Sequence, residues 1–254
     1  MHQSGEIKPN QSKANLDFFE EQERYYTESA GSNVLKLENF TKYVSREAVT
    51  KFLARNEVFK KQLGVHGSIL DFGVRRGASL MQWAHLSAIY EPANYTREIV
   101  GFDTFKGFPE VDVRYDVGTC NEIISRGALS VEAGMKEDIQ RAIGLHDSTR
   151  FLGHMKKTRI VEGDILDTLA PFLEDNRHIV VSLLHIDVDV YAPTKHILEN
   201  VLPRMPKGAV ILFDEINMKV FPGETVALSE VIGIGNLKIQ RLDYCPNVSY
   251  AVLS

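Results

Sequence analysis

Short apolar runs alternate with stretches of helical spacing over most of the chain. Five of these runs end in a glycine or an acid and predict buried strands, at residues 68–74, 97–103, 158–163, 178–187 and 208–214. Apolar positions at helical spacing predict helices at residues 77–89, 165–173, 194–201 and 225–232. Strands that alternate with helices indicate a parallel sheet covered on both faces, so the sequence predicts an α/β fold.

The N-terminal part follows a different pattern. Residues 1–38 are polar and predict a loose arm, with a helix expected near 15–26. Residues 39–63 have helical spacing and begin what we expect to be a single domain, 39–254.

The C-terminal part also differs from the alternating region. Residues 237–242 and 249–253 have the composition of two strands, separated by turn residues around Cys245-Pro-Asn247. This spacing predicts an antiparallel hairpin at the end of the sheet.

One connection is much longer than a helical crossover needs. It runs from Asp103 to Thr158, whereas a crossover between parallel strands takes far fewer residues. We expect residues 111–157 to contain extra helices that lie over the sheet as a lid. The alternative is an insertion that only packs and touches no ligand.

Charge and composition narrow the class of partner. Acidic residues outnumber basic ones by 34 to 29, which argues against nucleic-acid binding through a basic surface. Two cysteines, Cys120 and Cys245, with no CxxC, fit a reducing, cytoplasmic setting. The first fifteen residues have no apolar signal core, and the longest apolar run, 179–186, is too short for a membrane span. We expect no membrane partner, and we expect a homo-oligomer.

Acids and glycines gather where the predicted strands end. Because ligands of open parallel sheets bind beyond the carboxyl ends of the strands, these residues are candidates for one site. Both residue types are also common in strand-to-helix turns for structural reasons, but their presence at five strand ends favours a ligand site. The residues are Asp71, Gly73, Asp103, Gly163, Asp164, Asp187, Asp189, Asp214 and Glu215.

The first turn suits a nucleoside ligand. Gly73 and Gly77 let the backbone approach a ligand closely before a helix start. The turn is not GxGxxG, which argues against a nicotinamide dinucleotide. Asp103 could bind both hydroxyls of a ribose, and Asp164 could accept a hydrogen bond from an adenine amino group.

Four further carboxylates fall at adjacent strand ends, namely Asp187, Asp189, Asp214 and Glu215. Such a group repels itself unless a cation joins it, and oxygen ligands suit a hard cation such as Mg²⁺. His185 lies among them, and we interpret it as a buried or supporting histidine rather than a ligand.

Five motifs in this order resemble the macrocin-type O-methyltransferase family. They are Asp71-Phe-Gly-Val-Arg-Arg-Gly-Ala-Ser79, Asp103-Thr-Phe-Lys-Gly-Phe-Pro109, His185-Ile-Asp-Val-Asp-Val-Tyr-Ala-Pro-Thr194, Phe213-Asp-Glu215 and Phe221-Pro-Gly-Glu224. The enzymes of this family use S-adenosylmethionine and a divalent metal to methylate sugar hydroxyls in antibiotic biosynthesis. The resemblance runs from about Asn39 to the C-terminus. It is greatest to enzymes acting on nucleotide-activated 6-deoxyhexoses, such as the rhamnose 3-O-methyltransferase type of the calicheamicin pathway.

The resemblance implies a fold and a set of roles. The fold would be the class I methyltransferase (Rossmann-like) fold, with a seven-stranded sheet whose last pair is antiparallel. S-adenosylmethionine would be held by Asp71, Gly73, Gly77, Ser79, Asp103, Gly163 and Asp164, with Asp103 at the ribose and Asp164 at the adenine. Asp187, Asp214 and Glu215 would bind the metal, and Asp189 would be the catalytic base. The family usually has aspartate where this chain has Glu215, which is one methylene longer and could coordinate differently or through water.

Two other functions stay open on the sequence. A nicotinamide-dependent sugar dehydrogenase would share the fold, but the sequence shows no full glycine fingerprint and no clear Tyr/Lys pair. A non-catalytic nucleoside-binding module would not need the four carboxylates. No sequence motif identifies the sugar, the hydroxyl that is methylated or an attached nucleotide.

Overall fold

The computed structural model describes residues 13–117 and 124–254, and the chain divides into two units, residues 1–52 and 53–254. The first unit contains α1 (Lys13–Glu28), α2 (Asn33–Glu38) and the short helix η1 (Phe40–Lys42). α1 confirms the helix expected near residues 15–26. Cys120 falls outside the described residues.

The helix expected over residues 39–63 is shorter than predicted. The α-helix of this region, α3, spans Arg46–Lys61 and follows the separate turn of η1. Ser45 explains the later start, because its Oγ accepts a hydrogen bond from the backbone N of Ala48 at 3.1 Å. A side chain that caps the first turn in this way sets where a helix begins.

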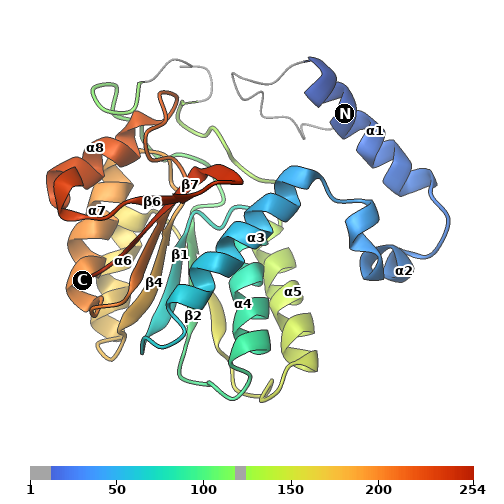
Figure 1. The fold of residues 1–254 in the computed structure, drawn as a ribbon, viewed down its shortest axis with the longest axis horizontal. Coiled ribbons are helices and arrows are strands. Elements are labelled where there is room, and N and C mark those ends of the chain that lie inside the picture. The colour runs from blue at the N-terminus through green and yellow to red at the C-terminus, as the bar shows by residue number, and fades with distance from the viewer. Residues whose placement is uncertain (1–12, 118–123) are drawn as a thin grey trace. The chain divides into compact units, whose positions relative to one another are not determined.

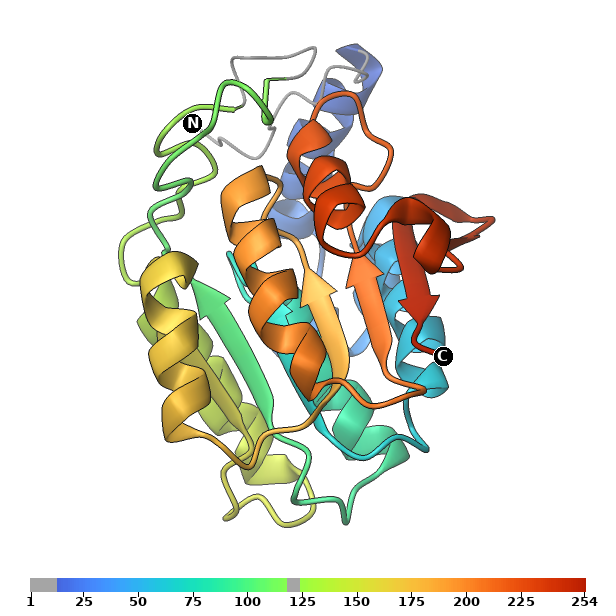
Figure 2. The ribbon, with the colours of Figure 1, turned by 90° about the vertical axis from the view of Figure 1, so that its left-hand side faces the viewer.

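The second unit is built on one seven-stranded sheet, with the strand order β3-β2-β1-β4-β5-β7-β6 (Figures 1 and 2). β1 to β5 are parallel, and β7 is antiparallel to both β5 and β6. This confirms the predicted α/β class I arrangement with a C-terminal antiparallel pair. The strands are β1 (Ser68–Phe72), β2 (Ile99–Asp103), β3 (Thr158–Glu162), β4 (Val181–Ile186), β5 (Val210–Phe213), β6 (Gln240–Leu242) and β7 (Cys245–Val252).

The turn of the C-terminal hairpin lies before the predicted position. Leu242 pairs with Cys245, so the turn residues are Asp243 and Tyr244, and the expected turn at 245–247 is wrong. Pro246 is compatible with a strand here because β7 pairs with β5 only from Ser249 onward. Its missing N–H therefore removes no hydrogen bond between β7 and β5.

Helices cover both faces of the sheet (Figure 1). The C-terminal part of α3 packs on one face with α4 (Ala78–Tyr90) and α5 (Met135–Thr149). α6 (Ile165–Asp175), α7 (Tyr191–Val201) and α8 (Pro222–Val231) cover the other.

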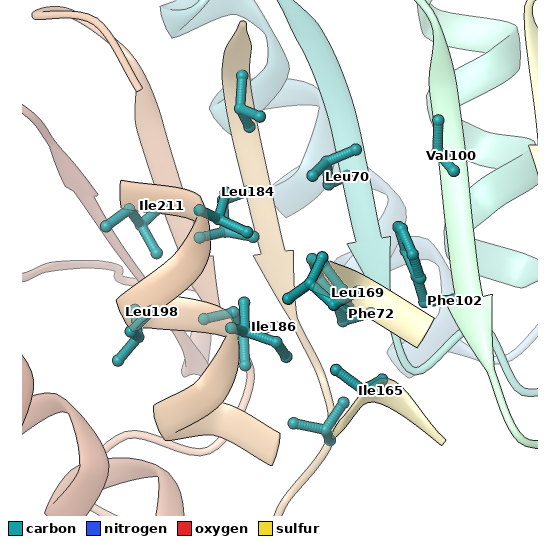
Figure 3. Packing of buried hydrophobic residues seen from close by; sticks show 14 of the residues in the cluster. Leu70, Phe72, Val100, Phe102, Ile165, Leu169, Leu184, Ile186, Leu198 and Ile211 are labelled. Atoms are coloured by element: carbon teal, nitrogen blue, oxygen red, sulfur yellow. The ribbon is translucent and has the colours of Figure 1, made fainter. Parts of the chain in front are cut away.

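Alternate strand residues fill the two cores, as the period of a strand requires. In β1, Leu70 and Phe72 join the cluster under α6 and α7 (Figure 3), whereas Ile69 joins the cluster under α3 and α4. Both cores are almost completely closed to solvent. The sheet is therefore a rigid support for the loops at its strand ends.

The long connection between β2 and β3 has two parts. α5 is an ordinary crossover helix, because Ile139 and Ile143 are buried in the same core as Ile69. Residues 104–117 and 124–134 lie beyond the strand ends (Figure 2), and there Phe108 and Ile124 pack against Val190. Only this second part has the placement of a lid.

In residues 13–117 and 124–254, no helix is both long enough and apolar enough to cross a membrane.

The turn after β1 is in contact with the loop after β4. Gly73 has a φ of +89°, and a Cβ at this position would lie 1.8 Å from the backbone O of Asp187. The amide of Asp187 in turn donates to Phe72 O at 3.0 Å. A side chain at Gly73 would therefore push apart the two loops that the central strands position.

Gly73→Ala should lower the free energy of unfolding by at least about 3 kcal/mol, because a forbidden contact adds to an unfavourable φ. Gly134→Ala is the matched control. Gly134 has nearly the same φ, +86°, but no atom within 4 Å of an added Cβ, so only the φ cost of about 1 kcal/mol remains. Urea unfolding of both variants measures the difference. Equal losses would show that the contact with Asp187 does not constrain the fold.

Candidate functional site

The site lies at the edge of the sheet where the strand order reverses, between β1 and β4. β1 has β2 on one side and β4 on the other, and the crevice between the loops of such strands is where open α/β sheets bind ligands. Gly73, Asp103 and Asp187 all lie at this edge. The structure thus brings the predicted donor residues and the predicted acid cluster to one place.

Asp71 lies under the crevice and is fully buried. Its Oδ2 accepts a hydrogen bond from Ser79 Oγ at 2.7 Å, and its Oδ1 contacts Nδ1 of His185. Both carboxylate oxygens are thus engaged with protein side chains. Asp71 orients Ser79 and His185, so any part that it has in donor binding is indirect.

Gly77 begins α4 in a left-handed conformation, with a φ of +85°. A Cβ there would lie 2.9 Å from Ile139 Cγ1 of α5. The glycine therefore serves the packing of α4 against α5 as well as the shape of the turn.

Asp103 is held by two backbone amides. Arg75 N donates to its Oδ2 at 2.7 Å, and Phe105 N donates to its Oδ1 at 2.6 Å. Both donors are non-glycine residues in the left-handed region, with φ of +51° and +56°. Burial raises the pKa of Asp103, and the two amides oppose that rise. Each oxygen keeps a second lone pair, so this fixed carboxylate can still accept from two adjacent hydroxyls.

Asp164 has a structural role of its own. It is the N-cap of α6, and its Oδ1 accepts from Leu166 N at 2.9 Å. Asp164 and Gly163 also line a pocket of about 510 Å³, together with Thr104, Phe108 and Arg126. The pocket lies beside the strand that ends in Asp103, which is where the predicted adenine contact requires space.

Three side chains converge at the ends of β4 and β5. One ligand atom from each of His185, Asp187 and Asp214 lies within 4.8 Å of the others. The Nδ1 of His185 is engaged with Asp71, and its buried Nε2 has no hydrogen-bond partner among the described residues. His185, which the sequence pattern suggested as a supporting residue only, is thus placed as a candidate ligand.

Glu215 lies next to this group but is not one of its three members. Its backbone N donates to Oε1 of Glu224 at 3.3 Å. Glu224 is fully buried, and burial raises its pKa well above the ordinary range; the charge of Asp189 adds to the rise, and the hydrogen bond from the amide of Glu215 opposes it. The sequence predicts no role for Glu224, although it lies in the Phe221-Pro-Gly-Glu224 motif, which could have marked it as a site residue.

Asp189 is buried at the start of α7 and has a φ of +62°. The left-handed region is uncommon for residues other than glycine, and aspartate tolerates it better than most. The conformation turns the chain between Asp187 and Asp189. Their side chains are therefore not held to the common face that two residues of a straight strand share.

A Tyr/Lys pair that the sequence did not show clearly is present on α7. Tyr191 OH lies 2.9 Å from Lys195 Nζ and donates to Glu230 Oε2 at 2.5 Å. The hydrogen bond to Glu230 raises the pKa of Tyr191. A dehydrogenase would need this tyrosine to give up its proton readily, so the pair does not support that alternative.

Comparisons with known proteins agree with this geometry. A family model described as a methyltransferase domain matches residues 70–216. The crystal structure of CalS11, a calicheamicin methyltransferase, is 31% identical, with a TM-score of 0.91 over 96% of this chain and 94% of that chain. An apo structure of CalS11, described as a TDP-rhamnose 3'-O-methyltransferase, is 28% identical, with a TM-score of 0.83 over 96% of both chains.

A curated relative adds a second match at the level of sequence. It is the 8-demethyl-8-(2,3-dimethoxy-alpha-L-rhamnosyl)-tetracenomycin-C 4'-O-methyltransferase of Streptomyces olivaceus, 29% identical over 162 residues, or 60% of this chain. The match spans about half of that relative, 54% of its length. The family match over residues 70–216 and the likeness along almost the whole of CalS11 show that this chain belongs to the methyltransferase-domain family, among its macrocin-type members, and is an S-adenosylmethionine-dependent O-methyltransferase.

Proposed function

We propose that this enzyme transfers a methyl group to a hydroxyl of a nucleotide-activated 6-deoxyhexose in antibiotic biosynthesis, with the help of a divalent cation. The observation that carries the proposal is the convergence of Asp187, Asp214 and His185 beside the Gly73 turn. The printed functions of both relatives support a 6-deoxyhexose as acceptor. CalS11, described as acting on TDP-rhamnose, supports the nucleotide-bound form, whereas the name of the tetracenomycin enzyme describes a rhamnosyl group already joined to tetracenomycin C.

The donor would lie along the ends of β1, β2 and β3. Gly73 and the start of α4 would face the methionine part, and Asp103 would accept from the two ribose hydroxyls. The adenine would occupy the pocket beside Gly163 and Asp164. This placement points the reactive end of the donor toward the loop after β4.

The residues at the ends of β4 and β5 fit a divalent cation. Asp187 and Asp214 offer oxygen ligands, and the buried Nε2 of His185 has no partner among the described residues. Carboxylates suit Mg²⁺ and Mn²⁺, and an imidazole ligand shifts the preference toward transition metals. Glu215 would join from the next position along the chain, through its longer side chain or through water.

The chemistry needs a stronger nucleophile than a neutral sugar hydroxyl. A cation held by Asp187, Asp214 and His185 would stabilise the developing negative charge on the acceptor oxygen. Asp189 accepts the hydroxyl proton as the oxygen attacks the methyl carbon. The C–O bond forms while the C–S bond breaks, and the sulfur leaves as a neutral thioether. The protein's main task is to align oxygen, carbon and sulfur, which the contact between the Gly73 turn and Asp187 serves.

Asp103→Ala should weaken binding of S-adenosylmethionine by about 1.5–3 kcal/mol, the value of charge-assisted hydrogen bonds that are lost. Titration calorimetry measures the affinity. Asp175→Ala removes the same charge from an exposed position at the end of α6 and is the control. If both variants bind the donor as the wild type does, the ribose lies elsewhere.

Asp189→Asn keeps the shape of the side chain and removes the base. It should lower kcat by about 10²–10⁴ while donor affinity stays unchanged.

Asp187→Asn should instead raise the Mg²⁺ concentration needed for half-maximal rate, and excess Mg²⁺ should restore part of the activity. Chelator should stop turnover of the wild type. Full activity of Asp189→Asn at saturating Mg²⁺ would remove Asp189 from the base role.

Transfer of a labelled methyl group to a panel of acceptors tests the function itself. The panel contains TDP-rhamnose, other nucleotide sugars and finished glycosides. We expect TDP-linked 6-deoxyhexoses to be methylated fastest. Transfer only to finished glycosides would overturn the nucleotide-bound acceptor, and binding of NAD in place of S-adenosylmethionine would overturn the enzyme class.

A further inference from the structure

Helix α7 has no cap from its own sequence. Its N-cap residue is Val190, whose side chain cannot accept a hydrogen bond from the first turn. The helix starts directly after Asp187 and Asp189, so the position of its first turn sets the position of both carboxylates. The orphan N–H groups of that turn need an acceptor from elsewhere in the fold.

Asp116, in the connection between β2 and β3, supplies that acceptor. Its Oδ1 accepts from Tyr191 N at 2.6 Å, and its Oδ2 accepts from Asp112 N at 2.8 Å. The side chain is only 2% exposed, although it belongs to the long connection between β2 and β3. A carboxylate at a helix N-terminus is stabilised by both the hydrogen bond and the helix dipole.

The neighbouring residue strengthens the same contact. The ring of Tyr115 stacks on the ring of Tyr191, with centroids 4.1 Å apart and planes 21° apart. Residues 112–116 are thus joined to the start of α7 by a hydrogen bond and by ring packing. We call this segment the strap.

Gly223 makes room for the strap. A Cβ at this position in the first turn of α8 would lie 2.1 Å from Asp116 Oδ1 and 2.5 Å from Tyr191 N. Glycine is unfavourable within a helix, so the close approach accounts for its presence. The next residue, Glu224, accepts from Glu215 N, and the same turn therefore touches the loops after both β4 and β5.

We propose that Asp116 is a positioning residue for methyl transfer, which fixes the start of α7 and through it the loop that carries Asp187 and Asp189. The inference rests on the proposed function for those two carboxylates. The strap is then the part of the connection between β2 and β3 that is anchored to the start of α7. The alternative is that Asp116 only adds stability to the connection.

Asp116→Ala in the full chain is the direct test. Without the cap, the amides of residues 187–191 should exchange with solvent about tenfold faster, whereas those of residues 103–105 should not change. With TDP-rhamnose as acceptor, kcat should fall about 10- to 100-fold, as expected for displaced reacting groups. The affinity for S-adenosylhomocysteine, measured by calorimetry, should stay within about twofold, because the donor residues lie on β1 to β3.

Two further variants separate positioning from stability. Asp116→Asn keeps an oxygen for Tyr191 N, so its kcat should return to within about threefold of the wild type. Gly223→Ala leaves Asp116 in place but puts a methyl group against both partners of the hydrogen bond, Asp116 Oδ1 and Tyr191 N, so it should reproduce the pattern of Asp116→Ala. Ser45→Ala removes the cap of α3 and should lower stability without changing kcat.

Unchanged exchange at residues 187–191 in folded Asp116→Ala would overturn the inference, and this readout needs no acceptor. A parallel loss of donor affinity and kcat that Asp116→Asn does not restore would also overturn it, in favour of a purely structural role. If Asp116→Ala does not fold, Asp116→Asn and Gly223→Ala decide by the same measurements. Loss of activity in Asp187→Asn and Asp189→Asn with full activity in Gly223→Ala would refute the positioning role and leave the proposed function intact.

Discussion

The contact between the turn after β1 and the backbone of Asp187 is the constraint on which the site depends. No side chain fits at Gly73, so the donor turn and the acid loop meet backbone to backbone. Both loops leave strands that are wholly buried, and a closely packed core does not let such strands shift. In the proposed function, the sheet would therefore set the distance between a methyl donor on one loop and an activated hydroxyl on the other. Methyl transfer gains most from this kind of alignment, because the sulfonium donor is already reactive.

The same edge of the sheet concentrates buried carboxylates, which is costly unless each is compensated. Backbone amides compensate three of these carboxylates. Asp103 and Asp116 each accept from two amides, and Glu224 accepts from one and has its pKa raised by burial. Asp71 is held by side chains instead. These hydrogen bonds fix the direction of each carboxylate at the edge of the sheet.

The sequence predicts the sheet well because its signals are local. Each central strand is a short apolar run that ends in an acid or glycine, and the structure confirms all five. The features that the sequence does not predict depend on contacts between residues that are distant in the sequence. The hairpin turn lies at Asp243 and Tyr244 because β7 reaches past the edge of β5. The left-handed conformations of Arg75 and Phe105 have no sequence signal, since neither residue type favours them, and the carboxylate of Asp103 compensates for their cost. The tie between Asp116 and Tyr191 joins residues 75 positions apart.

The connection after β2 shows no family motif beyond Pro109, yet its described residues, 104–117 and 124–134, touch both ends of the site. Near one end, Thr104, Phe108 and Arg126 line the pocket beside Asp164. Near the other, Asp116 caps α7, and Phe108 and Ile124 pack against Val190. Surface connections usually tolerate changes in sequence and length because little depends on them. Here one end is tied to the pocket beside Asp164 and the other to the start of α7. Changes of acceptor specificity within this segment are therefore expected only at side chains that face the crevice and make no contact with the pocket beside Asp164 or with the start of α7.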